Sequence, residues 1–286
     1  MLISLAGRQP LLRTEMRITD TGQEPVVIDA RRLKFAGPLV LAATAALTHV
    51  YAASNAAVSL RLPDSDAVTS YLQRMNVLEY VSSETKIIGR TPLETRTDCS
   101  KRLLEVTPVS LATQVTMIEQ LRIVTEANLG APWGDRVLAA FAELVENAVT
   151  HGISDLGAFA SAQVYSGRTT RVPRMEFAVV DTGIGVLEHL RQSRRPDHFR
   201  IATCADGLRG ALRRGSTTTS AGEVRGHGLA DLFARTGELG PAHVILRSGN
   251  GLARVTRRGT AGRTLRRTTE CSVTGTWAWA RVPFPQ

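Results

Sequence analysis

Glu143 and Asn147 are a pair of side chains whose types and spacing could support chemistry. They lie four residues apart in a segment whose apolar residues recur at helical spacing, so the two side chains should stack on one helix face, one turn apart. An asparagine oxygen is a hard, neutral metal ligand, and a glutamate can orient or deprotonate a nucleophile. The pair suits a magnesium–nucleotide site, and the simpler alternative is a solvated polar face on a helix that ends at Gly152.

Two later segments place glycines where a nucleotide site would need them. The strand-like segment 177–180 ends at Asp181-Thr182-Gly183-Ile184-Gly185, and segment 225–229 reads Arg-Gly-His-Gly-Leu before a helical pattern. Glycine has no side chain, so its backbone can pass close under a base and a ribose. N–H groups at the start of the helix from Leu229 can hold phosphate oxygens. Each glycine pattern alone is weak evidence, and an aspartate at a strand end is a turn former by default.

The order of the three segments, E-x-x-x-N-A, D-x-G-x-G and G-x-G-L, resembles the ATP-binding domain of the GHKL superfamily. That superfamily includes gyrase-type topoisomerases, heat-shock chaperones, sensor histidine kinases and mismatch-repair ATPases. The local likeness is greatest to the anti-sigma-factor serine kinases, in which a His-Gly pair also follows the first motif, as at His151-Gly152. The resemblance covers residues 98–286 and implies an α/β two-layer sandwich that binds ATP and Mg²⁺.

The resemblance implies a role for each matching residue. Asp181 would accept the adenine amino hydrogen, Asn147 would bind Mg²⁺, and Glu143 would polarise water or a substrate hydroxyl as the catalytic base. Further nucleotide contacts are expected from Gly183, Gly185, Gly226, His227, Gly228, Leu229 and Thr276. The segment 215–222 has no core-forming residues and holds the position of the ATP lid. For His151, an ordinary structural position at the C-terminal end of the helix is favoured over a catalytic role.

The first part of the chain alternates strands and helices. Strands are expected at 2–5 and 15–18 as a leading hairpin, at 26–29 and at 57–62, with helices at about 38–53 and after Pro63. This pattern resembles a STAS domain, the anti-anti-sigma-factor fold, over roughly 26–81. We expect a smaller STAS-like α/β domain at 1–82 and a linker at 83–97. Regulated STAS domains open their first helix with a phosphorylatable Ser or Thr, whereas residues 35–39 contain no hydroxyl, so the resemblance implies a fixed docking or dimerisation surface.

The remainder should supply the elements around the candidate site. Strands are expected at 103–109, 159–164, 175–180, 242–247, 252–256 and 275–282, helices at 110–129, around 143–147 and at 201–214, and a hairpin turn at Gly249-Asn250-Gly251. After Gly185 the sequence is irregular, and a solvated loop is expected at 191–196.

Composition limits the classes of partner. The net charge is +9 and the pI is near 10.3, yet almost all of the basicity comes from arginine, so charge is weak evidence for nucleic acid. The three cysteines lack C-x-x-C spacing, which argues against a disulfide framework and a zinc site. No early apolar run resembles a signal peptide, and polar residues interrupt the stretch 39–57. A cytoplasmic protein without membrane contact is expected.

These patterns lead to one main hypothesis and two alternatives. The main one is an Mg·ATP-binding regulator of the anti-sigma-kinase type, an ATPase or serine/threonine protein kinase that phosphorylates a partner protein or hydrolyses ATP slowly. The partner would be a STAS-domain protein or a sigma-factor regulator. The first alternative is a non-catalytic, ATP-dependent switch that docks a partner. The second is a DNA-associated ATPase that uses the arginines of 254–267, a segment without a recognition motif.

Overall fold

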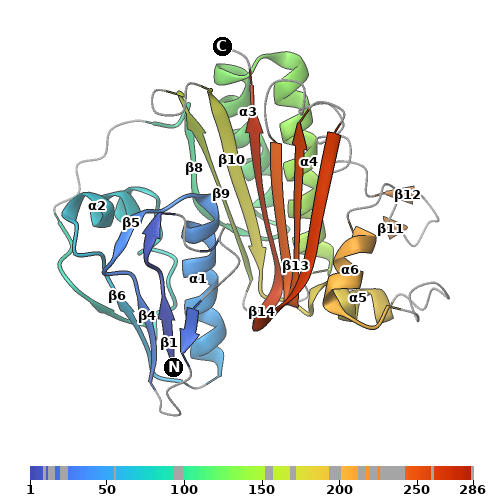
Figure 1. Ribbon diagram of the computed structural model, residues 1–286. Coiled ribbons are helices and arrows are strands. Elements are labelled where there is room, and N and C mark those ends of the chain that lie inside the picture. Colours follow the sequence, from blue (N-terminus) through green and yellow to red (C-terminus); the bar gives the residue numbers. More distant parts are fainter. Residues whose placement is uncertain are drawn as a thin grey trace.

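The computed structural model describes residues 1–8, 11, 17–19, 25–54, 56–92, 99–151, 157–167, 172–192, 201–211, 217–218, 224–225, 242–258 and 261–284. These residues form a mixed α/β protein with two five-stranded sheets, one mostly parallel and one antiparallel (Figure 1). We call them the first and second sheets. Two smaller strand pairs accompany them: β2 (Gly7–Arg8) with β5 (Leu33–Phe35), and β11 (Thr217–Thr218) with β12 (Val224–Arg225).

The first sheet is built from the N-terminal residues. Its order is β3 (Arg17–Thr19), β1 (Leu2–Ser4), β4 (Val26–Asp29), β6 (Val58–Arg61) and β7 (Lys86–Ile88). Strands β1 and β3 pair antiparallel, as the leading hairpin predicts, and all other pairs are parallel. Strand β7 lies inside the segment 83–97 that we expected to be a linker, so this sheet runs past the expected boundary at residue 82.

The second sheet contains β8 (Leu103–Val109), β9 (Ala158–Tyr165), β10 (Arg174–Asp181), β14 (Ala261–Pro283) and β13 (Ala242–Arg258). Strands β9 and β10 form where the sequence predicts strands at 159–164 and 175–180, and they pair antiparallel. Strand β13 reverses direction within its length, because His243 Nδ1 lies 3.1 Å from Thr256 Oγ1 although thirteen residues separate them. A straight strand would hold them about 40 Å apart. The reversal agrees with the turn predicted at Gly249-Asn250-Gly251.

Two helices cover one face of the second sheet. They are α3 (Gln114–Asn128) and α4 (Ala131–His151), which the sequence predicts with slightly different ends. Alternate strand residues such as Val179, Val244 and Ala278 join the buried faces of both helices in one apolar cluster. Phe141 of α4 meets Phe177 of β10 edge-to-face, with ring centroids 5.8 Å apart. We call this side of the sheet the α4 face.

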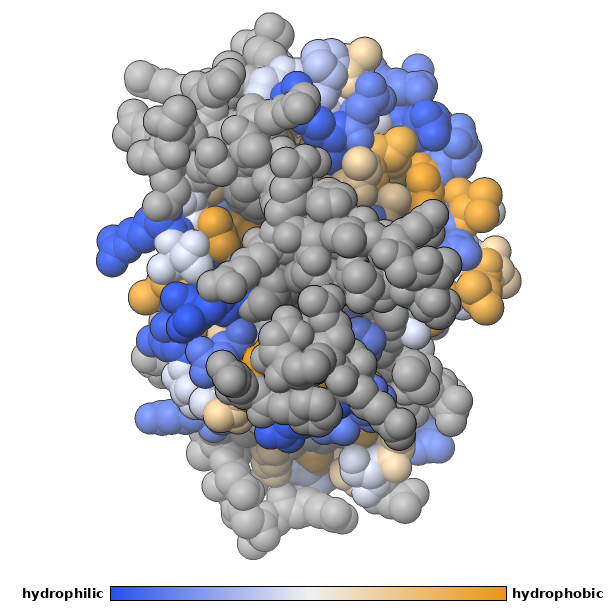
Figure 2. Space-filling model, turned by 90° about the vertical axis from the view of Figure 1, so that its right-hand side faces the viewer, coloured by the Kyte–Doolittle hydropathy of each residue, from blue (hydrophilic) through white to orange (hydrophobic). Residues whose placement is uncertain are grey.

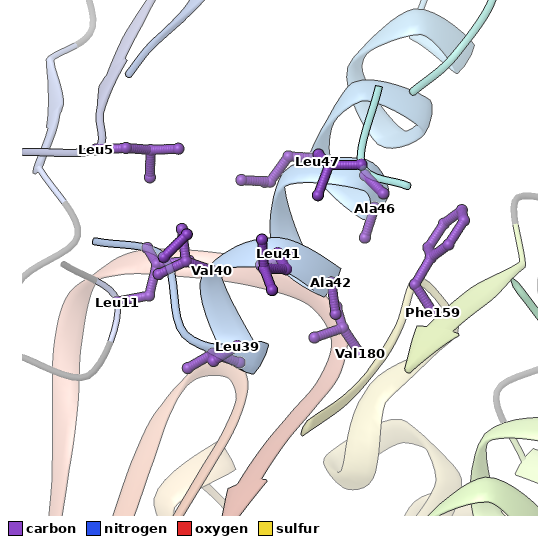
Figure 3. Close-up of a cluster of buried hydrophobic side chains, with 14 of the residues drawn as sticks. Leu5, Leu11, Leu39, Val40, Leu41, Ala42, Ala46, Leu47, Phe159 and Val180 are labelled. Carbon is purple, nitrogen blue, oxygen red and sulfur yellow. The ribbon is translucent and has the colours of Figure 1, made fainter. Parts of the chain in front are cut away.

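Helix α1 (Pro38–Ala53) covers the opposite side of the second sheet, which we call the α1 face. Figure 1 shows α1 between the two sheets, and Figure 3 shows its side chains directed both toward Leu5 and Leu11 and toward Phe159 and Val180. A helix enclosed in this way must be apolar nearly all round. Its buried hydroxyls bond within the helix, Thr44 to the Val40 carbonyl at 2.7 Å and Thr48 to the Ala45 carbonyl at 2.6 Å.

The layers therefore run first sheet, α1, second sheet, then α3 with α4. The two-layer arrangement predicted for 98–286 holds on the α4 face, but α1 adds a layer on the other face. The two predicted domains also share an apolar core, since Leu41 and Trp279 belong to the same cluster. Polar contacts join them too: Tyr71 of α2 (Asp66–Arg74) donates to Gln163 Oε1 at 2.6 Å.

Two short helices follow β10. Helix α5 (Gly185–Gln192) forms where the sequence predicts irregular structure, and α6 (Cys204–Ala211) forms inside the segment 201–214 expected to be helical. In the view of Figure 2, the described surface is mixed, with hydrophilic residues and a group of hydrophobic residues along the right edge. Over the described ranges, no helix has the length and apolarity needed to span a membrane.

Candidate functional site

The candidate site lies on the α4 face, where β10 ends. Side chains alternate along a strand, so Asp181 shares its face with Phe177 and Val179, which pack against the helices. The same rule places Ser248 of β13 and Thr276 of β14 on this face, and these two residues are cross-strand partners. The sequence therefore brings three polar side chains to one end of an otherwise apolar sheet face.

Asp181 is held by two backbone donors. Gly183 and Thr276 both donate their N–H groups to Asp181 Oδ1, at 2.9 Å and 3.1 Å. Only 8% of the residue is exposed. This burial raises the pKa of the carboxyl to about 6, and the hydrogen bonds from Gly183 and Thr276, whose hydroxyl also contributes, oppose the shift. The result is an oriented, desolvated acid whose protonation changes near neutral pH.

Glycines allow this end of the sheet to close around Asp181. Gly275 has a φ of +72°, and a β-carbon there would overlap the carbonyl oxygen and Oδ1 of Asp181. Gly185 has a φ of +78°, and a β-carbon would lie 2.7 Å from Ser248 Oγ. The predicted importance of Gly185 therefore has a steric basis, and Gly275 directly precedes Thr276, one of the predicted nucleotide contacts.

Ser248 is a site residue that sequence reasoning missed. Its Oγ accepts the Val186 N–H at 2.8 Å and donates to the Gly275 carbonyl at 3.0 Å, and the residue is only 1% exposed. It therefore fixes the first turn of α5 to β14. No sequence signal marks it, because a serine next to Gly249 at the end of a strand is typical of a turn.

Helix α4 brings the predicted pair to the same end of the sheet. Glu143 and Asn147 are both half-buried on this helix, one turn apart, as their spacing predicts. After the helix ends at His151, the next described residue, Gly157, accepts hydrogen bonds from Thr182 N at 3.3 Å and Thr182 Oγ1 at 2.8 Å. The C-terminal end of α4 and the end of β10 therefore lie at one end of the sheet.

Part of the predicted site lies outside the described residues. This applies to Gly226, His227, Gly228 and Leu229 and to most of the expected lid at 215–222, of which only β11 is described. Within the described ranges, no group of three or more His, Cys, Asp and Glu side chains could hold a metal ion. The predicted magnesium site differs in kind, because it relies on Asn147 together with nucleotide phosphates.

Among the predicted residues, Asp181, Gly183, Gly185 and Thr276 are brought together directly, and α4 carries Glu143 and Asn147 to the same end. The chain is thus a mixed α/β protein with a buried acid and closely packed glycines at the end of an antiparallel sheet. No family model matches the chain, and no curated protein matches it.

Proposed function

We propose that this chain binds Mg·ATP on the α4 face of the second sheet and acts as a regulatory protein of the anti-sigma-factor-kinase type, with a GHKL-like nucleotide domain. The observation that carries the proposal is the carboxyl of Asp181, which is buried at a strand end and oriented by Gly183 and Thr276. A carboxyl in such a place lowers stability unless a partner uses it, which favours a binding role.

The chemistry of the carboxyl suits adenine. An ionised Asp181 offers only acceptor oxygens, and the adenine amino group donates hydrogen. Guanine carries a carbonyl oxygen at the corresponding ring position, which would face the carboxylate with a second acceptor. Gly183 has no side chain, so its backbone can pass close to the base. The proposed site therefore selects adenine over guanine.

Glu143 and Asn147 supply the proposed reaction. Asn147 would hold Mg²⁺, which offsets the charge of the phosphates when it is bound. Glu143 would accept the proton of a serine or threonine hydroxyl, or of water, as that oxygen attacks the γ-phosphorus. The bond between the γ-phosphorus and its bridging oxygen then breaks, and ADP leaves with the bonding electrons. The product is a phosphorylated partner protein or, more slowly, inorganic phosphate.

The partner would be a separate protein, of the STAS-domain or sigma-regulator class that the sequence suggests. The first helix of the N-terminal part offers no acceptor, because residues 35–39 lack a hydroxyl. The start of that helix is also buried, and the Pro38 carbonyl accepts a hydrogen bond from Ser161 of β9 at 3.0 Å. The start of α1 therefore packs against the second sheet of the same chain.

A second candidate function is a non-catalytic switch, and the position of α1 favours it. Val180 and Trp277 directly adjoin Asp181 and Thr276 in sequence but face α1. A small cavity between α1 and β14 is lined by Tyr51 of α1 together with Thr182 and Trp277. Nucleotide binding on one face could therefore alter the packing of α1 on the other.

One titration series tests the proposed function. Competition between ATP, GTP and ITP for the purified chain with Mg²⁺ should rank ATP at least ten-fold above the other two, because only adenine carries an amino donor at C6, where the other two bases carry a carbonyl oxygen. Equal binding of all three nucleotides would contradict the adenine role of Asp181. Phosphate release, or transfer to a protein substrate, then separates the kinase from the switch, since the switch binds ATP without turnover.

A further inference from the structure

Among the residues that the structure describes, none supplies a hydrogen-bonding counterpart for the charge of Arg247, on the face of the sheet opposite the nucleotide site. Arg247 lies in β13 directly before Ser248, so alternation directs its side chain to the α1 face. It is only 1% exposed, and its Nε, Nη1 and Nη2 atoms are all buried without a hydrogen-bond partner in this described part of the chain. The guanidinium lies over the Trp277 ring, with Cζ 5.9 Å from the ring centroid.

The neighbouring positions do not supply an anion. Arg247 pairs with Trp277 across the strands and follows Ile245 on the same face, and both are apolar core residues. Burial lowers the pKa of the Arg247 guanidinium, Cys271 opposes this shift, and the charge of Arg267 lowers the pKa further. Arg281, on the same face, provides a contrast, because its Nε donates to Glu176 Oε1 at 2.9 Å.

The hairpin that carries Arg247 is cationic on this face. Leu252 belongs to the α1-face cluster, so alternation places Arg254 on that face, and cross-strand pairing adds Arg267 opposite Leu252 and Arg263 opposite Thr256. Arg254 and Arg263 are exposed, and Arg267 acts on the charge of Arg247. These arginines raise the local concentration of anions over this face of the hairpin.

We propose that Arg247 is the recognition group of a second binding site, on the α1 face of the second sheet, for a small oxyanion of the phosphate, sulfate or carboxylate type. A buried cation without a partner is costly, and a paired one is not, so a bound oxyanion would stabilise the fold. The planar guanidinium matches such ligands through two parallel hydrogen bonds. This site does not depend on the nucleotide site, because its residues point to the other face.

Thermal unfolding of the full chain tests the proposal. Sodium phosphate, sulfate or acetate replaces sodium chloride from 0 to roughly 20 mM at constant ionic strength. The Tm of the wild type should begin to rise near the Kd of the oxyanion and then increase with the logarithm of its concentration, reaching about 5 °C or more at a hundred-fold excess over Kd. Acetate alone giving this logarithmic rise identifies a carboxylate site, and phosphate or sulfate alone identifies a tetrahedral-anion site.

Variants separate this site from general salt effects and from the nucleotide site. Arg247→Met should raise the Tm in chloride and remove the logarithmic rise, leaving only the small, gradual stabilisation that phosphate and sulfate give most proteins. Arg247→Lys, which keeps the charge, should weaken the response at least several-fold. Exposed Arg254→Gln and nucleotide-site Asp181→Asn should keep most of it. Equal responses in the wild type and in either Arg247 variant, or only the gradual response in the wild type, would overturn the proposal.

Discussion

Thr276 donates its backbone N–H to Asp181 Oδ1 over 3.1 Å, which joins residues that are 95 positions apart in sequence. The bond crosses from the last strand of the sheet to the end of β10. Because Gly183 donates to the same oxygen, the carboxyl is oriented both by its own loop and by the C-terminal strand. The candidate site therefore forms only when β14 is in place.

Asp181→Asn should stabilise the chain above pH 6. The folded-state pKa is raised from 3.8 to about 6, so the folded protein binds the proton more tightly than the unfolded chain. Stability therefore falls as pH rises from about 4 to about 6 and then stays constant, a loss of up to about 3 kcal/mol. The asparagine has no such titration, so urea unfolding between pH 4 and 8 should show a flatter profile. A variant less stable than the parent at pH 7 would assign Asp181 a structural role.

Gly275→Ala should damage both the fold and nucleotide binding. The substitution places a β-carbon against Asp181 and strains a backbone with a φ of +72°. We expect a loss of about 2–4 kcal/mol, more than the 1–3 kcal/mol of a strained backbone alone. Gly130→Ala is the matched control, because its φ is +74° and no atom lies near the added carbon. Equal losses of unfolding free energy in the two variants would exclude the contact with Asp181.

Ser248→Ala should loosen the start of α5. The change leaves the Val186 N–H without its acceptor and the Gly275 carbonyl without its donor, at a cost of about 1–3 kcal/mol. Nucleotide affinity should fall as well, since α5 begins at Gly185. Thr150→Ala removes an exposed hydroxyl that bonds to the Glu146 carbonyl at 2.7 Å, and it should change neither property appreciably. Chemical unfolding and a nucleotide titration on the three proteins measure both effects.

Glu143→Gln should reduce turnover without reducing nucleotide affinity. A positioned base contributes roughly 10²–10⁴ in rate, so phosphate release or transfer should fall by that factor. Glu146→Gln is the control on the same helix, because Glu146 is exposed whereas Glu143 is half-buried. Steady-state kinetics with Mg·ATP compare the variants. Unchanged turnover in Glu143→Gln would show that Glu143 is not the catalytic base. The non-catalytic switch would then be the remaining candidate function.

Much of the fold follows from local sequence signals. Helix α1 was predicted at 38–53 and forms over Pro38–Ala53, because Pro38 sets its first turn and the apolar run fixes its length. Strand β8 also forms with the predicted bounds, 103–109, because its apolar residues mark its length. No such local signal predicts helix α5, because its first turn depends on a hydrogen bond from Val186 to Ser248, which lies 62 residues further along the chain. Strand β7 is only three residues long and depends on its pairing with β6.

The residues of the candidate site also fall into two groups, those that local sequence patterns predict and those that such patterns do not predict. The sequence predicts the residues that belong to short motifs with a recognisable spacing. These residues are Glu143, Asn147, Asp181 and the glycines of the D-x-G-x-G and G-x-G-L motifs. Ser248 acts through contacts between strands, which no local pattern encodes. The burial of Arg247 was equally unpredictable, because an arginine at the end of an apolar strand ordinarily reaches solvent.

Isothermal titration calorimetry of the wild type and Asp181→Asn with ATP and Mg²⁺ tests the central claim most directly. The account predicts saturable binding of one ATP by the wild type and at least a ten-fold weaker affinity in the variant, which remains folded. No heat from ATP or ADP with the folded wild type, or equal affinities in the two proteins, would contradict a nucleotide site built on Asp181.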